Sequence, residues 1–174
     1  MFSVERATPS NGLFQQLREQ WDGSLATYNE DPAFFRLPFL EHAEKIANES
    51  PPSSNYGIYI LRDEHGTFHG LFHANLARLP KTSGKTLRVL WILSAPKYEF
   101  EDVSETDMAL LISSVLVGSL NLAEGEMDAN HLKILLDGQA ERRFAHGFAF
   151  HAKGKLTKIV VEVRGAWLHM DNIR

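Results

Sequence analysis

Three consecutive extended stretches in the middle of the chain constrain its fold most. After a proline-rich loop at residues 50–55, the hydrophobic period changes from helical to extended. Residues 56–62, 67–79 and 87–94 are rich in aromatic and branched aliphatic side chains, and turn-forming residues separate them. This pattern predicts three consecutive antiparallel strands joined by two hairpins.

Shorter elements are predicted before these strands. Alternation at residues 2–5 indicates a first strand, and helical spacing indicates helices at residues 13–21 and 39–48. Asp22 is interpreted as the end of the first helix, and Asp31 as the N-cap of the second.

The C-terminal half is predicted to alternate helices and strands. Ser104 and Asp107 resemble a capping box at the start of a strongly apolar helix that ends near Gly125. A strand, a short helix and two further strands are then expected at residues 132–136, 139–146, 148–152 and 157–164. Residues 167–170 form an apolar tail, which packs either on its own core or in a homodimer seam.

The composition predicts one globular domain over residues 1–174, because the length is close to the roughly 150 residues of a typical domain. The absence of cysteine excludes disulfides and Cys-ligated metals, and a net charge of -4 argues against nucleic acid partners. We find no signal-peptide pattern, and the longest apolar run, residues 108–118, is shorter than the ~20 residues of a membrane span. We therefore expect a cytoplasmic protein without a membrane partner.

The resulting order of elements, β-α-α-β-β-β-α-β-α-β-β, resembles that of the GNAT family, the Gcn5-related N-acetyltransferases. Asp137, Ala140, Phe144 and the pair Gly147–Phe148 are similar to the family's asparagine, alanine, tyrosine and glycine-phenylalanine pattern. The resemblance implies an α+β fold with a GNAT-like mixed, mostly antiparallel sheet flanked by helices. It also implies N-acyl transfer from acetyl-CoA or another acyl-CoA to a small-molecule amine.

The resemblance further suggests which residues serve that reaction. Glu99 or His73 is the candidate general base that removes the proton of the amine. The end of the fourth strand is expected to hold the acyl group through backbone bonds. The candidate cofactor-binding residues are Leu93, Ser94, Ala95 and Tyr98.

One segment departs from the family pattern. A glycine-rich loop in the family holds the pyrophosphate of acetyl-CoA, whereas residues 97–106 contain no glycine. Residues 97–107 carry five carboxylates and one lysine, so they account for the whole net charge of -4. Two like charges about 6 Å apart repel by nearly 3 kcal/mol at an effective dielectric of about 20. Phe144 also lacks the hydroxyl that can protonate the departing thiolate in the family, so the pattern indicates a degenerate site.

Three functions therefore stay open. The chain is an acyltransferase with impaired acetyl-CoA binding, a non-catalytic binding or structural module of the same fold, or a domain that senses a small cation through its acidic segment. His69 and His73 are expected on one strand face, but about 13 Å apart along the strand. One metal ion cannot bridge that distance, and no metal site is predicted.

Overall fold

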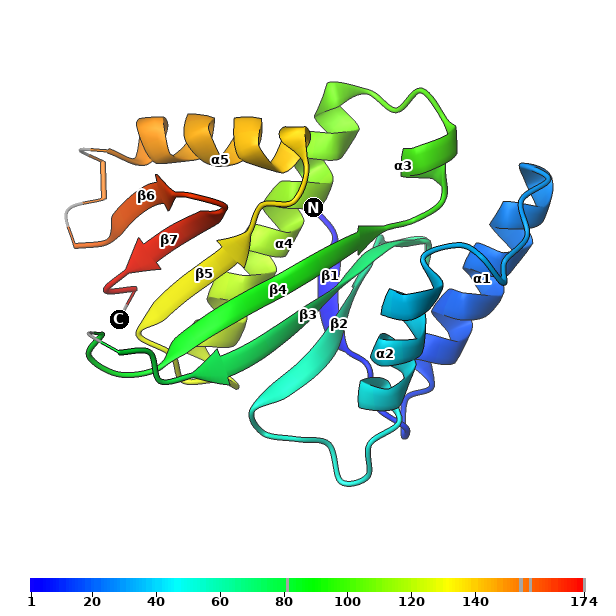
Figure 1. Cartoon of the computed structure of the whole chain (residues 1–174), viewed down its shortest axis with the longest axis horizontal. Helices are drawn as coiled ribbons and strands as arrows, with labels where there is room; N and C mark the ends of the chain where they lie inside the picture. The colour runs from blue at the N-terminus through cyan, green and yellow to red at the C-terminus, as the bar shows by residue number, and fades with distance from the viewer. Residues whose placement is uncertain (81, 154, 157, 174) are drawn as a thin grey trace.

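The computed structural model describes residues 1–80, 82–153, 155–156 and 158–173. Seven strands form one sheet in the order β1-β2-β3-β4-β5-β7-β6, as Figure 1 shows. Adjacent strands are antiparallel except β4 and β5, which are parallel. The predicted α+β class, with a GNAT-like mixed and mostly antiparallel sheet flanked by helices, is confirmed.

The elements follow the predicted order, with one additional short helix. The strands are β1 Ser3–Arg6, β2 Tyr56–Arg62, β3 Phe68–Ala77, β4 Thr86–Ser94, β5 His131–Leu135, β6 Val160–Arg164 and β7 Trp167–Asp171. The helices are α1 Leu13–Thr27, α2 Leu37–Ala47, α3 Lys97–Phe100, α4 Glu105–Glu124 and α5 Gln139–Ala152.

Different helices cover the two faces of the sheet (Figure 1). Trp91 and Ile92 are neighbours on β4 and therefore point to opposite faces. Ile92 lies with residues of α4 and α5, whereas the Trp91 ring contacts Phe39 and His42 of α2. We call these the α4 face and the α2 face. On the α2 face, α1 contacts β3 and α2 contacts β2.

The parallel strands β4 and β5 separate partway along their length. Their pairing runs from Thr86 opposite His131 to Val89 opposite Ile134. Beyond that pair, residues 90–94 of β4 continue beside β3, where Leu90 is an extra residue in the register. Such a bulge bends a strand and increases its twist. The result is a gap between the ends of β4 and β5, and Figure 1 shows the two strands diverging.

Helix α4 joins the N-terminal strand to the core. Ser104 caps the helix, because its Oγ accepts the Asp107 backbone N–H at 3.1 Å, so the predicted helix start is confirmed. Val4 of β1 lies directly against Gly118, and the Phe2 N–H donates to Ser114 Oγ at 3.1 Å. Among the described residues, α4 is the one helix long and apolar enough to cross a membrane, and it packs here on four strands as a core helix.

The predicted ends of the first two helices were wrong. Helix α1 continues past Asp22 to Thr27, because Leu25 extends its buried face by one further turn after Trp21. Helix α2 begins at Leu37 rather than near Asp31. The Asp31 carboxylate instead accepts the Ala33 N–H at 2.9 Å, which closes a turn before the helix.

The predicted strand at residues 148–152 was also wrong, because these residues are the last turns of α5. Gly147 lies inside the helix, where an added Cβ meets no described atom within 4 Å, so nothing stops the helix there. The apolar tail is the strand β7, which a two-residue loop joins to β6. Gly165 in that loop has a φ of 60°. Thr157, where the preceding strand was expected to begin, lies outside the described residues.

Candidate functional site

A cleft between the first turns of α4 and α5 leads toward the gap in the sheet. The outer part is an open cavity of about 340 Å³. Its lining is mostly apolar, with one charge from each helix at the mouth: Glu105, Met108, Ala109, Ile112, Ala140, Arg143 and Phe144. Ile112 and Phe144 also border a separate apolar void of about 10 Å³ beside Ile92 of β4 and Ile134 of β5. The outer cavity therefore suits a mostly apolar ligand, and the void beneath it has room for about one water molecule.

On the α2 face, His73 of β3 lies within a group of aromatic rings, one strand away from the gap. It is opposite Trp91 in the register, and its ring centroid is 5.5 Å from that of Trp91 and 5.4 Å from that of His42. The side chain is 7% exposed, and neither ring nitrogen has a hydrogen-bond partner among the described residues. Burial, and then the charges of His42 and Arg88, lower the pKa of His73 to about 4. At neutral pH the ring is therefore uncharged, and it is a weaker base than an exposed histidine.

His69 does not share this face, contrary to the sequence-based expectation. Gly70 lies opposite Leu61 and Phe68 opposite Arg62, so His69 is an extra residue at a bulge. Its ring stacks on Phe2 at 3.8 Å, on the α4 face. Counting residues along a regular strand could not reveal this reversal.

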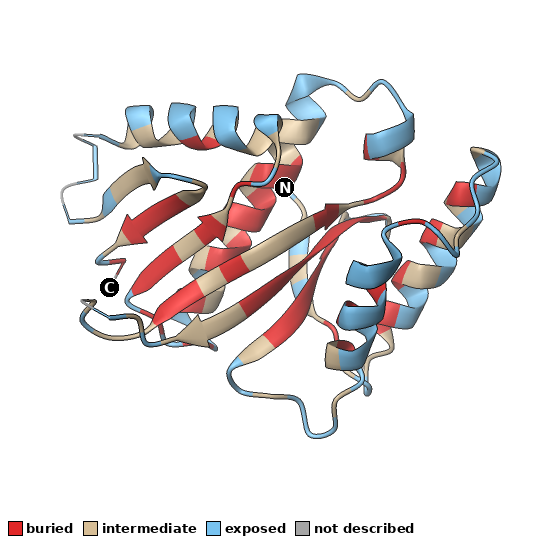
Figure 2. Ribbon diagram, viewed as in Figure 1, coloured by how far each residue is buried: buried red, intermediate tan, exposed pale blue. Residues whose placement is uncertain are grey.

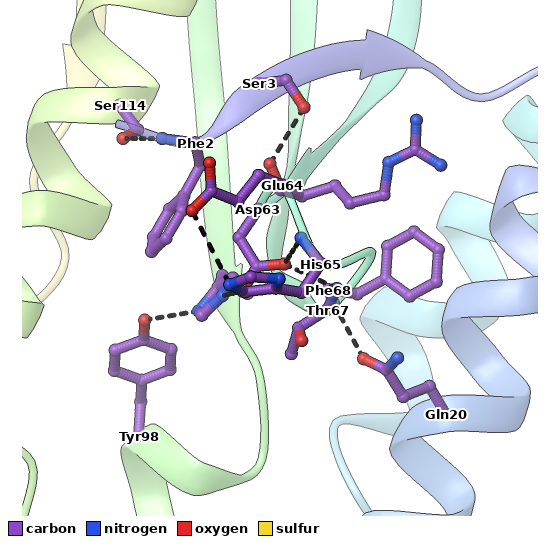
Figure 3. Close-up of polar contacts among 12 residues, drawn as sticks. Phe2, Ser3, Gln20, Asp63, Glu64, His65, Thr67, Phe68, Tyr98 and Ser114 are labelled. Carbon is purple, nitrogen blue, oxygen red and sulfur yellow. Dashed lines mark hydrogen bonds and ion pairs between the residues drawn. The ribbon is translucent and has the colours of Figure 1, made fainter.

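The His69 ring connects a hairpin turn to helix α3 through Asp63 and Tyr98, which are both labelled in Figure 3. Its Nε2 donates to the Asp63 carboxylate at 3.0 Å, and its Nδ1 accepts from the Tyr98 hydroxyl at 2.9 Å. Burial lowers the pKa of His69 and raises the pKa of Tyr98 to about 12. The hydrogen bond from His69 holds the pKa of Asp63 below its usual range. A neutral His69 satisfies both bonds, so the cluster fixes α3 to the sheet.

The two candidate bases occupy separate places. Glu99 is on α3, where its carboxylate is 3.0 Å from the Arg36 guanidinium in the loop before α2. It borders a surface cavity together with Phe34 and Phe100. His73, by contrast, is on β3, where it lies opposite Trp91 of β4.

The candidate cofactor-binding residues lie at the end of β4 and on α3. The Ala95 N–H already donates to the His69 carbonyl at 2.9 Å. Because successive amides of a strand point to opposite sides, the amide of Ser94 points toward the gap instead. Leu93 is buried, and the Tyr98 hydroxyl is held by His69. Of these four residues, Ser94 has the backbone position best suited to contact a ligand in the gap.

The acidic segment folds into α3 and the start of α4, where the GNAT family has its phosphate-binding loop. Glu99 pairs with Arg36, and Glu101 accepts a hydrogen bond from the Tyr28 hydroxyl. Asp107 accepts from Ser104 Oγ at 2.7 Å. These carboxylates therefore serve local structure, and the helix start is capped by its own residues.

Some features of this region were missed from the sequence. Ala140 and Phe144 were matched to the family pattern, but the cleft that they form with α4 was not predicted, because the two helices are far apart in the chain. Phe144 and Phe148 stack on one face of α5, so Gly147–Phe148 does not mark a junction between a helix and a strand. Within the described ranges, no group of three or more His, Asp or Glu side chains is arranged to hold a metal ion.

No protein-family model and no curated protein sequence matches this chain. Similar solved structures include a GNAT-family acetyltransferase from Staphylococcus aureus, with a TM-score of 0.45 and 13% identity over 100% of both chains. A transcriptional regulator from Bacillus halodurans has a TM-score of 0.47 and 12% identity, covering 95% of this chain and 100% of that chain.

A third similar structure is the GCN5-related glucosamine N-acetyltransferase region of a fungal multi-domain beta-N-acetylglucosaminidase. It has a TM-score of 0.46 and 16% identity, and the match covers 94% of this chain but 17% of the fungal chain. With identities and TM-scores this low, these likenesses carry no argument about activity. The GNAT-like fold is assigned from the order of elements and the sheet topology.

Proposed function

We propose that this protein is a GNAT-like N-acyltransferase that takes its acyl donor in the cleft between α4 and α5. The observation that carries the proposal is the position of this cleft on the α4 face, where Ile112 and Phe144 line it and also border a small void beside Ile92 of β4 and Ile134 of β5. An acyl-CoA thioester is the donor that suits it, because its pantetheine arm is long, narrow and largely uncharged. Arg143 at the mouth is the cation available to a phosphate group.

In this reaction the amine approaches from the α2 face and attacks the thioester carbonyl. A C–N bond forms, the C–S bond breaks, and the thiolate leaves along the cleft. The unprotonated ring of His73 takes the proton that the amine loses. Phe144 has no hydroxyl to offer the thiolate, so the thiolate receives its proton from solvent.

The acidic segment favours a second candidate, a non-catalytic binding module of the same fold. Helix α4 is capped by Ser104, and α3 occupies the place of a glycine-rich loop. Without that loop, donor affinity depends on the cleft alone. The two candidates differ in whether acetyl-CoA binds there and reacts.

Calorimetric titration with acetyl-CoA tests the donor site. We expect saturable binding to the unchanged protein and its loss in the Ala109→Trp variant, because an indole fills the cavity between α4 and α5. Ala26→Trp, on the exposed side of α1, is the matched control and should bind as the unchanged protein does. If millimolar acetyl-CoA gives no heat, or if Ala109→Trp binds normally, the donor site is not this cleft.

A further inference from the structure

Figure 1 shows that α1 and α2 leave β5, β7, β6 and most of β4 uncovered on the α2 face. The strand registers place a row of polar side chains across this part of the sheet. Residues opposite each other on neighbouring strands point to the same face. The strand registers place one such series side by side from β3 to β6: Asn75, Arg88, Lys133, His169 and Glu162. We call this series the polar row.

The polar row carries an uncompensated positive charge. Arg88 and Lys133 lie directly opposite each other, an arrangement that costs stability when nothing balances it. The Arg88 Nε donates to the uncharged Asn75 amide oxygen at 2.9 Å, and Glu162 pairs with Arg164 instead. Neither Arg88 nor Lys133 forms an ion pair with any residue in the described ranges.

Nearby positive charges contribute to the lowered pKa values of the two buried histidines on this face. After burial and His42, Arg88 is the next cause of the lowered pKa of His73. Burial, and then Lys133 and Arg164, lower the pKa of His169. Both histidines therefore stay uncharged at neutral pH, and the excess charge of the row resides on Arg88 and Lys133.

Apolar side chains on the same face border the row where the gap begins. Trp91 lies two residues after Val89, the last residue of β4 paired with β5, and Leu135 directly follows Ile134, the last paired residue of β5. Trp167 lies opposite Leu135, so two indoles and a leucine flank the entrance. His73, with both ring nitrogens unpartnered, lies against Trp91.

We propose that the polar row binds the carboxylate of the acceptor, so that the acceptors are small amines of the α-amino-acid type. Arg88 and Lys133 balance the carboxylate, the apolar rings contact the side chain, and the amine lies toward the gap and His73. This inference rests on the proposed function, since it names the acceptor of the same reaction. A cationic polyamine does not suit this face, because it brings no negative charge to balance the row.

Two measurements on the full chain test the inference separately from the reaction. Calorimetry without donor compares the standard α-amino acids with their carboxamides, and mass spectrometry with acetyl-CoA detects acetylated products. At least one free amino acid should bind about tenfold or more tightly than its carboxamide. Arg88→Gln and Lys133→Gln should each remove that difference, whereas Lys153→Gln, at the exposed end of α5, should preserve it.

The outcomes separate the two proposals. Binding of a free amino acid without acetyl transfer overturns the acyltransferase and keeps the carboxylate site. Transfer to amines regardless of a carboxylate, or no preference for any free acid, overturns the inference. Thermal unfolding reports on folding: Lys133→Gln should be at least as stable as the unchanged protein, because it relieves repulsion with Arg88. If Lys133→Gln melts at a lower temperature than the unchanged protein, the positive charge of the polar row is compensated by other groups.

Discussion

Replacing Gly118 by alanine should destabilise the protein by about 2 kcal/mol, because α4 and β1 leave no room for a side chain there. An added Cβ would lie 2.4 Å from Val4 Cγ2 and 3.0 Å from Val4 Cβ. Val4 is β-branched and short, so the strand itself has to move. Urea denaturation gives the change in the free energy of unfolding.

Gly147→Ala is the matched control for this substitution. It is also a glycine inside a helix, but an added Cβ there meets no described atom within 4 Å. Alanine should therefore stabilise α5 by about 0.5–1 kcal/mol, as expected for helix propensity alone. If Gly118→Ala and Gly147→Ala change the stability alike, β1 is not packed against α4 as described.

Acidification should cost the protein about 3 kcal/mol through His73 alone. The pKa of His73 is about 4 in the folded protein and 6.5 in the unfolded chain. Between these values the unfolded state binds the proton more readily. The penalty is absent above about pH 6.5, grows as the pH falls, and is complete near the folded pKa of about 4.

His73→Phe isolates this contribution, because phenylalanine keeps an aromatic ring and cannot be protonated. Denaturation at several pH values should show the variant losing less stability than the unchanged protein between neutral pH and about pH 4.5. The control His65→Phe, at an exposed turn, should follow the unchanged protein. If the free energy of unfolding changes with pH in the same way for His73→Phe and the unchanged protein, the imidazole of His73 is not buried without partners.

The His73→Phe variant should also lose acyl transfer, because it removes the base.

Local patterns predicted the parts of the fold that local forces determine. The strands β2, β3 and β4 carry their own alternation and turns, and Ser104 marks the start of α4 within four residues of sequence. The same reasoning wrongly ended a helix before Gly147 and did not predict a turn at Gly165. The first is tolerated inside a helix, and the second forms a turn that joins β6 to an unexpected strand.

The site was less accessible from the sequence because it depends on contacts between distant segments. His73 was predicted from the sequence as a candidate general base, and that role stays a prediction. The bulge that turns His69 to the α4 face leaves no periodic signal. The pairing of Arg88 with Lys133 depends on the register of two parallel strands, which a crossover through α4 separates in the chain.

Hydrogen exchange of the backbone with and without acetyl-CoA tests the donor cleft most directly. The account predicts slower exchange in the first turns of α4 and α5 and at the end of β4, since these segments surround the cleft and the gap. Exchange in the acidic segment, residues 97–103, should stay unchanged. Protection confined to that segment, or no protection anywhere, would contradict an acyl donor bound between α4 and α5.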